Sequence, residues 1–269
     1  MSDVQLIVTG ELERNALHIA LKTVFPRATF LPPQYVDGVT SAGVPELLEG
    51  ARIPTTLERF ALALVAAVDP GRTGNAPDLV LAVDDIELVN MERPERVISA
   101  VRAAVSRQID RHHPSSTRCE KTRQMVRERC SLHLFSPMVE AYFFGDDRSL
   151  DAAAVKRAPT LVPGCDLEEF ETDDPAYLSG AAEVREAARH PKRYLRHLCE
   201  PVPYRETKQG VAALRAMRCR HVLTPQTQVR FLRAMVADLA DALGEAAPSG
   251  TLHPLTSRFG ARDNVFRNC

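Results

Sequence analysis

The segment Asp78–Asn90 constrains the fold of this chain more than any other part of the sequence. It contains an unbroken apolar run, Leu79–Val83, and Asp84, Asp85 and Glu87 follow directly after it. A short run of this kind is typical of a strand that is covered on both faces, as in the middle of a parallel sheet. In open α/β sheets, ligands bind at the carboxyl ends of the strands. Carboxylates this close together repel one another unless water, a cation or a basic group compensates them, so this strand end is the best candidate for a site.

The N-terminal segment has the pattern that opens a βαβ unit. Val4–Val8 is expected to be a strand, and Thr9–Gly10 turns the chain into a helix over Glu11–Val24, whose apolar residues have helical spacing. Pro26 ends this helix, and Ala28–Leu31 is expected to form a short second strand.

The rest of the chain is expected to contain one further strand and a series of helices. Ser131–Phe135 alternates like a strand. Thr55 and Glu58 have the spacing of a capping box, and Thr224 and Gly244 have the residue types that begin and end a helix. The expected helices are Thr55–Val68, Pro94–His112, Ala181–Ala188, Lys192–Cys199, Thr207–Met217 and Pro225–Leu243.

The sequence therefore predicts an α/β fold in which a parallel sheet is flanked by helices, with a mainly helical C-terminal part. At 269 residues the chain is long enough for such a core with a helical appendage. The expected divisions are an α/β core over 1–155, an acidic loop over 156–180, a helical part packed on the core over 181–244, and an extended tail over 245–269. An acidic run such as that of the second division is typical of a solvated loop.

Charge and composition restrict the partners of the protein. The net charge is −1, so that contact with nucleic acid must come from a local basic patch. Trp is absent and aromatic residues make up 6% of the chain, which argues against a base-stacking surface. The sequence lacks the G-x-x-x-x-G-K-[ST] motif, so a partner ATPase would have to supply any ATP-dependent step.

Cysteine spacing and hydropathy bear on the cellular location. The 6 cysteines have no C-x-x-C spacing, which favours reduced thiols over a disulfide framework or a zinc site. The longest apolar stretch, Phe60–Val68, is too short to span a bilayer, and the N-terminus has no basic region followed by a long apolar run. We therefore expect a cytoplasmic protein with no membrane partner.

Acidic residues follow both of the first two core strands. Glu11 and Glu13 come after the first strand, and Asp84 and Asp85 end the central one. Carboxylates from neighbouring parallel strands can share Mg²⁺, which prefers oxygen ligands and can polarise a phosphodiester. The alternative for Glu11 and Glu13 is that they complement the macrodipole at a helix N-terminus.

Glu140 is a further candidate, because it lies at an otherwise apolar strand-to-helix junction beside Phe143 and Phe144. Such a carboxylate is either paired structurally, with Arg127 or Arg129 as the expected partners, or it serves as a third ligand or a general base.

Two basic segments are candidate phosphate contacts. One is Arg118–Arg129, and the other contains Lys192, Arg193, Arg196 and Lys208. Basic side chains near an acidic site can hold phosphates without reading a base sequence. The alternative is that these segments are solvated helix faces.

The order of several motifs resembles that of a known family. These motifs are Gly10-x-x-Glu13, Asp84-Asp85, Ser136-Pro137-x-x-Glu140-Ala141-Tyr142, His190–Leu195 and Tyr204–Gly210. Their order is similar to that of the small TOPRIM-like proteins of bacterial defence and mobile-element neighbourhoods, which are related to the overcoming-lysogenisation-defect nucleases. The resemblance spans roughly residues 4–240.

This resemblance implies a TOPRIM-type fold and Mg²⁺-dependent phosphoryl chemistry on nucleic acid, with Mn²⁺ as an alternative ion. The implied metal ligands are Glu13, Asp84 and Asp85; Glu11 and Glu140 complete the implied catalytic set, and Lys192, Arg193 and Lys208 would hold phosphates. Two positions depart from the family pattern: Thr9 replaces its first carboxylate, and Ile86 replaces the second acid of its Asp-x-Asp motif. Glu11 and Asp85 lie close enough in sequence to substitute, but a shift of one residue along a strand changes the face to which a side chain points.

Three hypotheses follow. The first is a metal-dependent nuclease or other nucleic-acid-processing protein, acting in a defence or mobile-element system. The second is a catalytically degenerate TOPRIM-like subunit that binds a partner protein or nucleic acid without cleavage. The third is an enzyme or binding protein for a small phosphorylated metabolite, a function that the near-neutral net charge allows.

Overall fold

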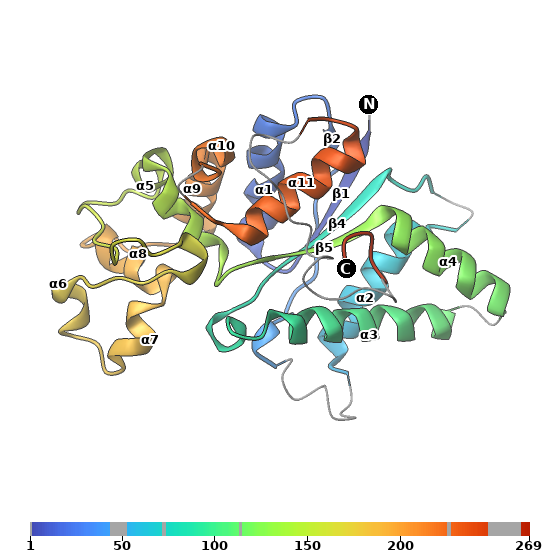
Figure 1. Ribbon diagram of the computed structural model, residues 1–269, viewed down its shortest axis with the longest axis horizontal. Coiled ribbons are helices and arrows are strands. Elements are labelled where there is room, and N and C mark those ends of the chain that lie inside the picture. The colour runs from blue at the N-terminus through green and yellow to red at the C-terminus, as the bar shows by residue number, and fades with distance from the viewer. Residues whose placement is uncertain (1, 44–52, 72–73, 113–114, 225–226, 247–264) are drawn as a thin grey trace.

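The computed structural model describes residues 2–43, 53–71, 74–112, 115–224, 227–246 and 265–269 (Figure 1). It confirms the α/β class: a parallel sheet lies between helices, and the C-terminal part is mainly helical. Among the described helices, none combines the length and the apolar composition that crossing a lipid bilayer requires. Pro225, the expected start of the last helix, and residues 247–264 of the expected tail lie outside the described residues.

The central strand of the sheet is the apolar segment that the sequence singled out. The strands are β1 (Asp3–Val8), β2 (Thr29–Phe30), β3 (Gln34–Tyr35), β4 (Leu79–Asp85) and β5 (Cys130–Phe135). They are all parallel, in the order β2-β1-β4-β5, with β3 also paired to β1. β4 therefore lies between β1 and β5, and its apolar residues are fully buried because helices cover both faces.

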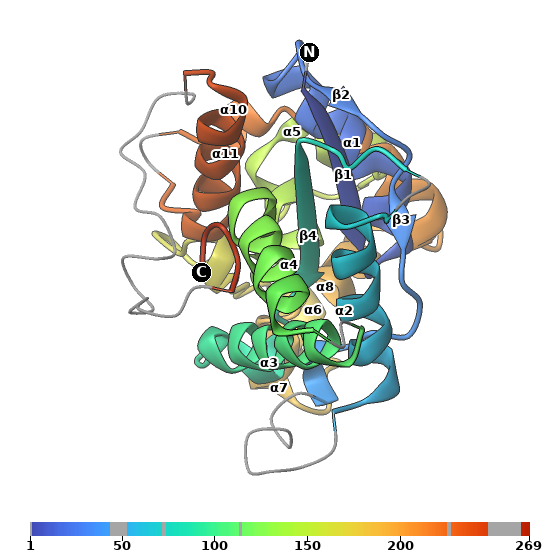
Figure 2. The same cartoon turned by 90° about the vertical axis from the view of Figure 1, so that its right-hand side faces the viewer.

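Alternate residues of the strands point into two separate cores. One core lies under α1 (Glu11–Val24) and α11 (Arg230–Leu243), and the other lies under α2 (Thr55–Val68), α3 (Pro94–His112) and α4 (Ser116–Arg129). Figures 1 and 2 show these two helical layers on opposite sides of the sheet. Such a sandwich leaves the carboxyl ends of the strands uncovered by the main helices.

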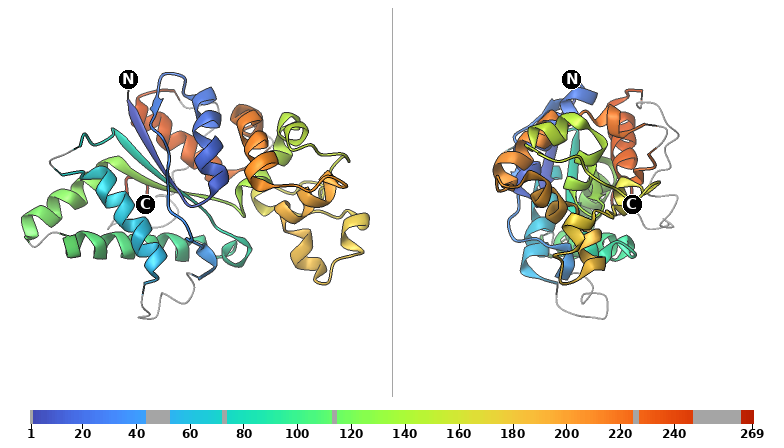
Figure 3. Two further views of the ribbon diagram at one scale, coloured as in Figure 1. Left: turned by 180° about the vertical axis from the view of Figure 1, so that it is seen from behind. Right: turned by 90° about the vertical axis from the view of Figure 1, so that its left-hand side faces the viewer.

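A group of short helices lies beyond those carboxyl ends (Figures 1 and 3). It comprises the 3₁₀ segments η2 (Leu88–Asn90), η3 (Val139–Gly145) and η4 (Leu167–Glu169), the π-helical turn η5 (Glu206–Gly210), and α5 (Asp147–Ala152), α6 (Pro175–Leu178), α7 (Val184–Ala188), α8 (Pro191–Cys199), α9 (Val211–Ala216) and α10 (Cys219–Val222). α9 packs against α1 and thereby fixes this group to the core. The expected strand-to-helix junction after β5 is a 3₁₀ segment rather than an α-helix.

Two of the predicted helix caps were wrong. α2 has the predicted bounds, Thr55–Val68, but Pro54 occupies its N-cap position without a side-chain cap, so Thr55 and Glu58 do not form a capping box. α11 begins at Arg230, after the expected Thr224 cap. Its C-terminus is as predicted, because Gly244 adopts the left-handed conformation that stops a helix (φ 63°).

The N-terminus of α11 is held by the acidic segment 156–180. The carboxylate of Glu168 accepts hydrogen bonds from the backbone N–H groups of Phe231 and Leu232 at 2.9 to 3.0 Å. Asp166 accepts bonds from the N–H groups of Gln228 and Val229 at 2.7 and 3.1 Å. Glu168 is only 6% exposed, so the prediction of a solvated loop is wrong at this position. These carboxylates therefore cap the N-terminus of α11, the role that the sequence predicts for Thr224.

The end of the chain packs on the sheet. The N–H of Arg267 donates to the carbonyl of Cys130 at 2.7 Å, and the side chain of Asn268 pairs with both backbone groups of Leu132. Phe266 is completely buried. Residues 265–269 therefore cover the outer edge of β5.

We expect the substitution Glu168→Ala to destabilise the protein by roughly 2–3 kcal/mol, because it leaves buried N–H groups of α11 without acceptors. Urea unfolding measures this loss. The matched control is Glu169→Ala, since Glu169 is exposed and adjacent. Equal unfolding midpoints for the two variants would contradict the capping role.

Candidate functional site

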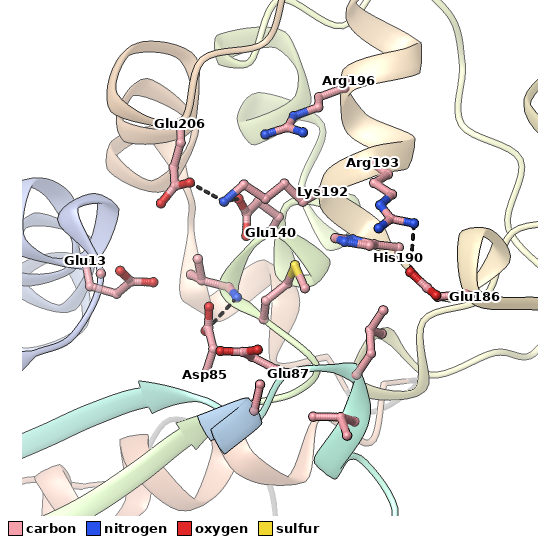
Figure 4. A pocket seen from close by; sticks show the side chains of 16 residues that line it. Glu13, Asp85, Glu87, Glu140, Glu186, His190, Lys192, Arg193, Arg196 and Glu206 are labelled. Atoms are coloured by element: carbon pink, nitrogen blue, oxygen red, sulfur yellow. Dashed lines mark hydrogen bonds and ion pairs between the residues drawn. The ribbon is translucent and has the colours of Figure 1, made fainter. Parts of the chain in front are cut away.

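A cavity of about 770 Å³ lies between the carboxyl ends of the strands and the group of short helices (Figure 4). Acidic and basic side chains share its wall. The charged or titratable residues that line it are Glu13, Asp85, Glu87, Glu140, Glu186, His190, Lys192, Arg193, Arg196 and Glu206. The predicted sheet edge is thus the location of a cavity with both signs of charge.

Glu13 points into this cavity from the first turn of α1. Its side chain is 4% exposed, and its Oε2 is buried without a hydrogen-bond partner. Gly10 makes room for it: a Cβ atom at that position would lie 1.8 Å from Oε2 of Glu13. Burial, together with the charges of Glu140, Glu206 and Asp84, raises the pKa of Glu13 to about 8. A buried carboxylate with an unpaired oxygen is costly, which is why such groups mark functional sites.

The two consecutive aspartates of β4 have different environments. Asp85 lines the cavity and accepts a hydrogen bond from the N–H of Val139 at 3.1 Å. Burial, followed by the charges of Glu13 and Glu140, raises the pKa of Asp85 well above its usual value. Asp84 accepts a bond from the hydroxyl of Thr9 at 2.5 Å, and burial raises its pKa to about 6.

Glu140 is paired, but not with the arginines that the sequence suggested. The Nζ atom of Lys192 lies 3.7 Å from Oε1 of Glu140, and the hydroxyl of Tyr204 lies 3.5 Å from the same oxygen. Lys192 also forms an ion pair with Glu206. The expected pairing of Glu140 with Arg127 or Arg129 was therefore wrong, because those arginines lie at the end of α4, on another part of the fold.

The electrostatics of this pair follow from its burial. Glu140 is 2% exposed, and burial raises its pKa although the ammonium of Lys192 opposes the shift. Burial alone would lower the pKa of Lys192, but Glu140 and Glu206 raise it, so Lys192 remains charged. Lys192 is thus a cation held among acids.

Glu206 is a site residue that the sequence analysis did not select. It lies on η5, the π-helical turn that forms part of the Tyr204–Gly210 motif. A Cβ atom at Gly210 would lie 2.5 Å from the hydroxyl of Tyr204 and 2.8 Å from Cδ1 of Leu12, so this turn requires glycine for its close approach to α1. π-Helical turns occur frequently at functional sites. The Tyr204–Gly210 motif was the signal that could have identified this residue, but the sequence analysis selected only Lys208 from it and not Glu206.

The remaining predicted residues divide between the cavity wall and the surface. Arg193 lines the cavity and pairs with Glu186 at 2.8 Å. Glu11 and Lys208 are exposed, and neither belongs to the described lining of the cavity. The structure therefore brings together Glu13, Asp85, Glu140, Lys192 and Arg193, as Figure 4 shows.

Two further residues of the wall have unusual states. Glu87 has a positive φ of 59°, which is strained for a residue with a side chain, and its carboxylate accepts a hydrogen bond from Thr40 at 2.5 Å. Burial, followed by the charge of Arg193, lowers the pKa of His190 to about 4, so its imidazole is neutral at physiological pH.

The donor set fits a hard divalent cation in its chemistry. Within the described residues, no three His, Cys, Asp or Glu side chains are already arranged around one metal position. Mg²⁺ does not need such a cage, because it commonly uses one or two carboxylates, several waters and the phosphates of a substrate. Glu13, with an unpartnered buried oxygen, and Asp85 meet that requirement.

Comparison with protein-family models, with curated proteins and with solved structures found no match to this chain. The relation to TOPRIM-like proteins therefore stays a prediction from the sequence motifs.

Proposed function

We propose that this protein is a TOPRIM-like, Mg²⁺-dependent nuclease that hydrolyses a phosphodiester of a nucleic acid in the cavity at the carboxyl end of the sheet. One observation carries the proposal: the buried carboxylates of Glu13 and Glu140 and the half-buried carboxylate of Asp85 share a single cavity with Lys192 and Arg193. A divalent cation would compensate the acidic side chains of this wall, and a phosphate would compensate the basic ones.

In this proposal each side chain has a distinct role. Glu13 and Asp85 would hold Mg²⁺, with Mn²⁺ as an alternative, and the ion would neutralise charge on the phosphate and polarise it. Lys192 and Arg193 would bind the non-bridging oxygens of the phosphate. Glu140 would accept the proton of the attacking water, since its raised pKa makes it a better base than an exposed carboxylate.

A second candidate is a TOPRIM-like subunit that binds nucleic acid, or a partner protein, without cleavage. The environment of Asp84 favours it. The carboxylate of Asp84 is committed to the hydroxyl of Thr9, the residue that replaces the family's first acid. In this candidate the cavity would keep its phosphate contacts but would lack a complete set of metal ligands.

We expect single- or double-stranded DNA or RNA to be cleaved by the wild-type protein with Mg²⁺ or Mn²⁺, and not with EDTA. The variant Asp85→Asn should lower the rate by about 100-fold or more, because it removes a charged metal ligand. Gel analysis of end-labelled substrates measures the rate.

The control is Glu11→Gln, because Glu11 is an exposed carboxylate on the first turn of α1 and does not belong to the described lining of the cavity. Its rate should equal that of the wild type. Binding of nucleic acid without any metal-dependent cleavage would instead support the second candidate. Tight binding of a mononucleotide with no binding of nucleic acid would reject the nuclease and the nucleic-acid-binding form of the second candidate, in favour of a small phosphorylated ligand.

A further inference from the structure

A second cavity, also of about 770 Å³, adjoins the first one. The two cavities share Glu186, Arg193 and Arg196 in their walls. The two arginines belong to α8, so this helix separates the first cavity, named the acidic cavity after Glu13, Asp85 and Glu140, from the second one. A ligand that fills the first cavity and passes Arg196 therefore enters the second one.

The shared wall supplies a cation for a second phosphate. Arg193 is already paired with Glu186 at 2.8 Å. Arg196 is exposed, and its guanidinium forms no ion pair within the described part of the chain. An exposed guanidinium offers a planar, bidentate contact to a phosphate. Arg196 is thus placed to bind the phosphate next to the one in the acidic cavity.

The second cavity itself suits a base rather than a phosphate. Two rings, those of Tyr177 and His197, form part of its wall and lie 5.2 Å apart. The ring of Tyr177 also packs 5.1 Å from that of the buried Tyr194. The hydroxyl of Tyr177 donates to the carbonyl of Ala187 at 3.3 Å, and the ring itself is held by its packing against Tyr194. The lining also contains the carboxylates of Glu183, Glu186 and Glu200, which repel an anion but leave a neutral base unaffected.

From this arrangement we infer that the substrate is single-stranded nucleic acid, with the reacting phosphate in the acidic cavity, the next phosphate on Arg196 and the intervening base against Tyr177. The inference rests on the proposed function and specifies its substrate class. A base inside a duplex is stacked and paired, and it cannot enter a side cavity unless it is extruded at a cost. The low aromatic content of the chain does not oppose this inference, since a single base requires only one ring, and Tyr177 lines the second cavity.

The test compares the variants Tyr177→Leu and Tyr177→Phe in binding a fluorescent oligothymidylate and the corresponding duplex, with Ca²⁺ in place of Mg²⁺ to prevent cleavage. Tyr177→Leu should weaken binding of the single strand about tenfold, because stacking on the ring is lost, whereas Tyr177→Phe should keep wild-type affinity. Arg196→Ala should weaken it similarly and lower the slope of log K against log salt by roughly 0.7. Arg220→Ala is the control, as Arg220 is exposed and lies in the lining of neither cavity.

Equal affinity for duplex and single strand, or equal affinity of the two Tyr177 variants, would overturn the inference. The same proteins are also unfolded by urea with and without Mg²⁺. If Mg²⁺ raises the free energy of unfolding but the Tyr177 and Arg196 variants bind the oligonucleotide as the wild type does, the second cavity is not part of the substrate site and the proposed nuclease stands. Preference for the single strand that depends on Tyr177, without a metal response, supports the strand path and rejects the metal-dependent nuclease.

Discussion

Replacing Glu13 with Gln should stabilise the metal-free protein at high pH. In the folded state the pKa of Glu13 is raised to about 8, from an ordinary value of 4.5. The folded protein therefore holds a proton that the unfolded chain releases, so the free energy of unfolding falls as the pH rises from 4.5 to 8 and stays low above 8. The Gln side chain does not titrate. We expect the variant to be more stable than the wild type by roughly 2–4 kcal/mol at pH 9 and nearly equal to it at pH 5.

Urea unfolding in EDTA at several pH values measures this difference. Addition of Mg²⁺ should then stabilise the wild type and leave Glu13→Gln unchanged, because the ion binds the charged carboxylate only in the folded protein. Glu11→Gln is the matched control, and it should behave as the wild type in both respects. A Glu13→Gln protein that is less stable than the wild type at pH 9, or that gains equal stability from Mg²⁺, would contradict the role of Glu13. A gain in stability paired with a loss of ion binding is the usual consequence of removing a functional charge.

The fold was predictable because the signals that determine it are local. The run Leu79–Val83 has no polar residue, so it had to lie where both faces of the sheet are covered. α3 has the predicted bounds, Pro94–His112, since its proline and its apolar spacing are contained in the segment itself. The start of α11 was not predictable in this way, because its capping carboxylate, Glu168, lies 63 residues before Phe231 in the chain.

The site was predictable in its location but not in its detail. Parallel strands bring their carboxyl ends together, so the sequence predicts that Glu13 lies near Asp85. The sequence did not determine which of two adjacent aspartates lines the cavity, since that depends on the contact of Asp84 with Thr9 on the neighbouring segment. The pairing of Lys192 with Glu140 and Glu206 depends on how α8 and η5 pack on η3, and no local pattern encodes such packing.

That pairing leads to the second large effect, which is expected for Lys192→Met. The variant keeps the aliphatic stem but removes the cation that compensates Glu140 and Glu206. Glu140 is 2% exposed, so its charge would be left buried and unpaired, whereas Glu206 has a side chain that is 33% exposed and would be partly hydrated. We therefore expect a loss of roughly 2–4 kcal/mol at neutral pH, which urea unfolding in EDTA measures.

The response of Lys192→Met to metal separates a structural lysine from one that substitutes for an ion. If the ammonium of Lys192 balances the acids of the cavity in place of a divalent cation, then Mg²⁺ should stabilise Lys192→Met more than it stabilises the wild type, because the ion no longer competes with a fixed positive charge. The variant should at the same time bind nucleic acid more weakly, because it has lost a phosphate contact. Lys208→Met is the control, since Lys208 is exposed and outside the cavity lining, and it should change neither quantity. If Mg²⁺ stabilised Lys192→Met less than it stabilises the wild type, Lys192 would support binding of the ion instead of replacing it. That result would contradict the proposed roles, in which the acids bind the metal and Lys192 binds the phosphate.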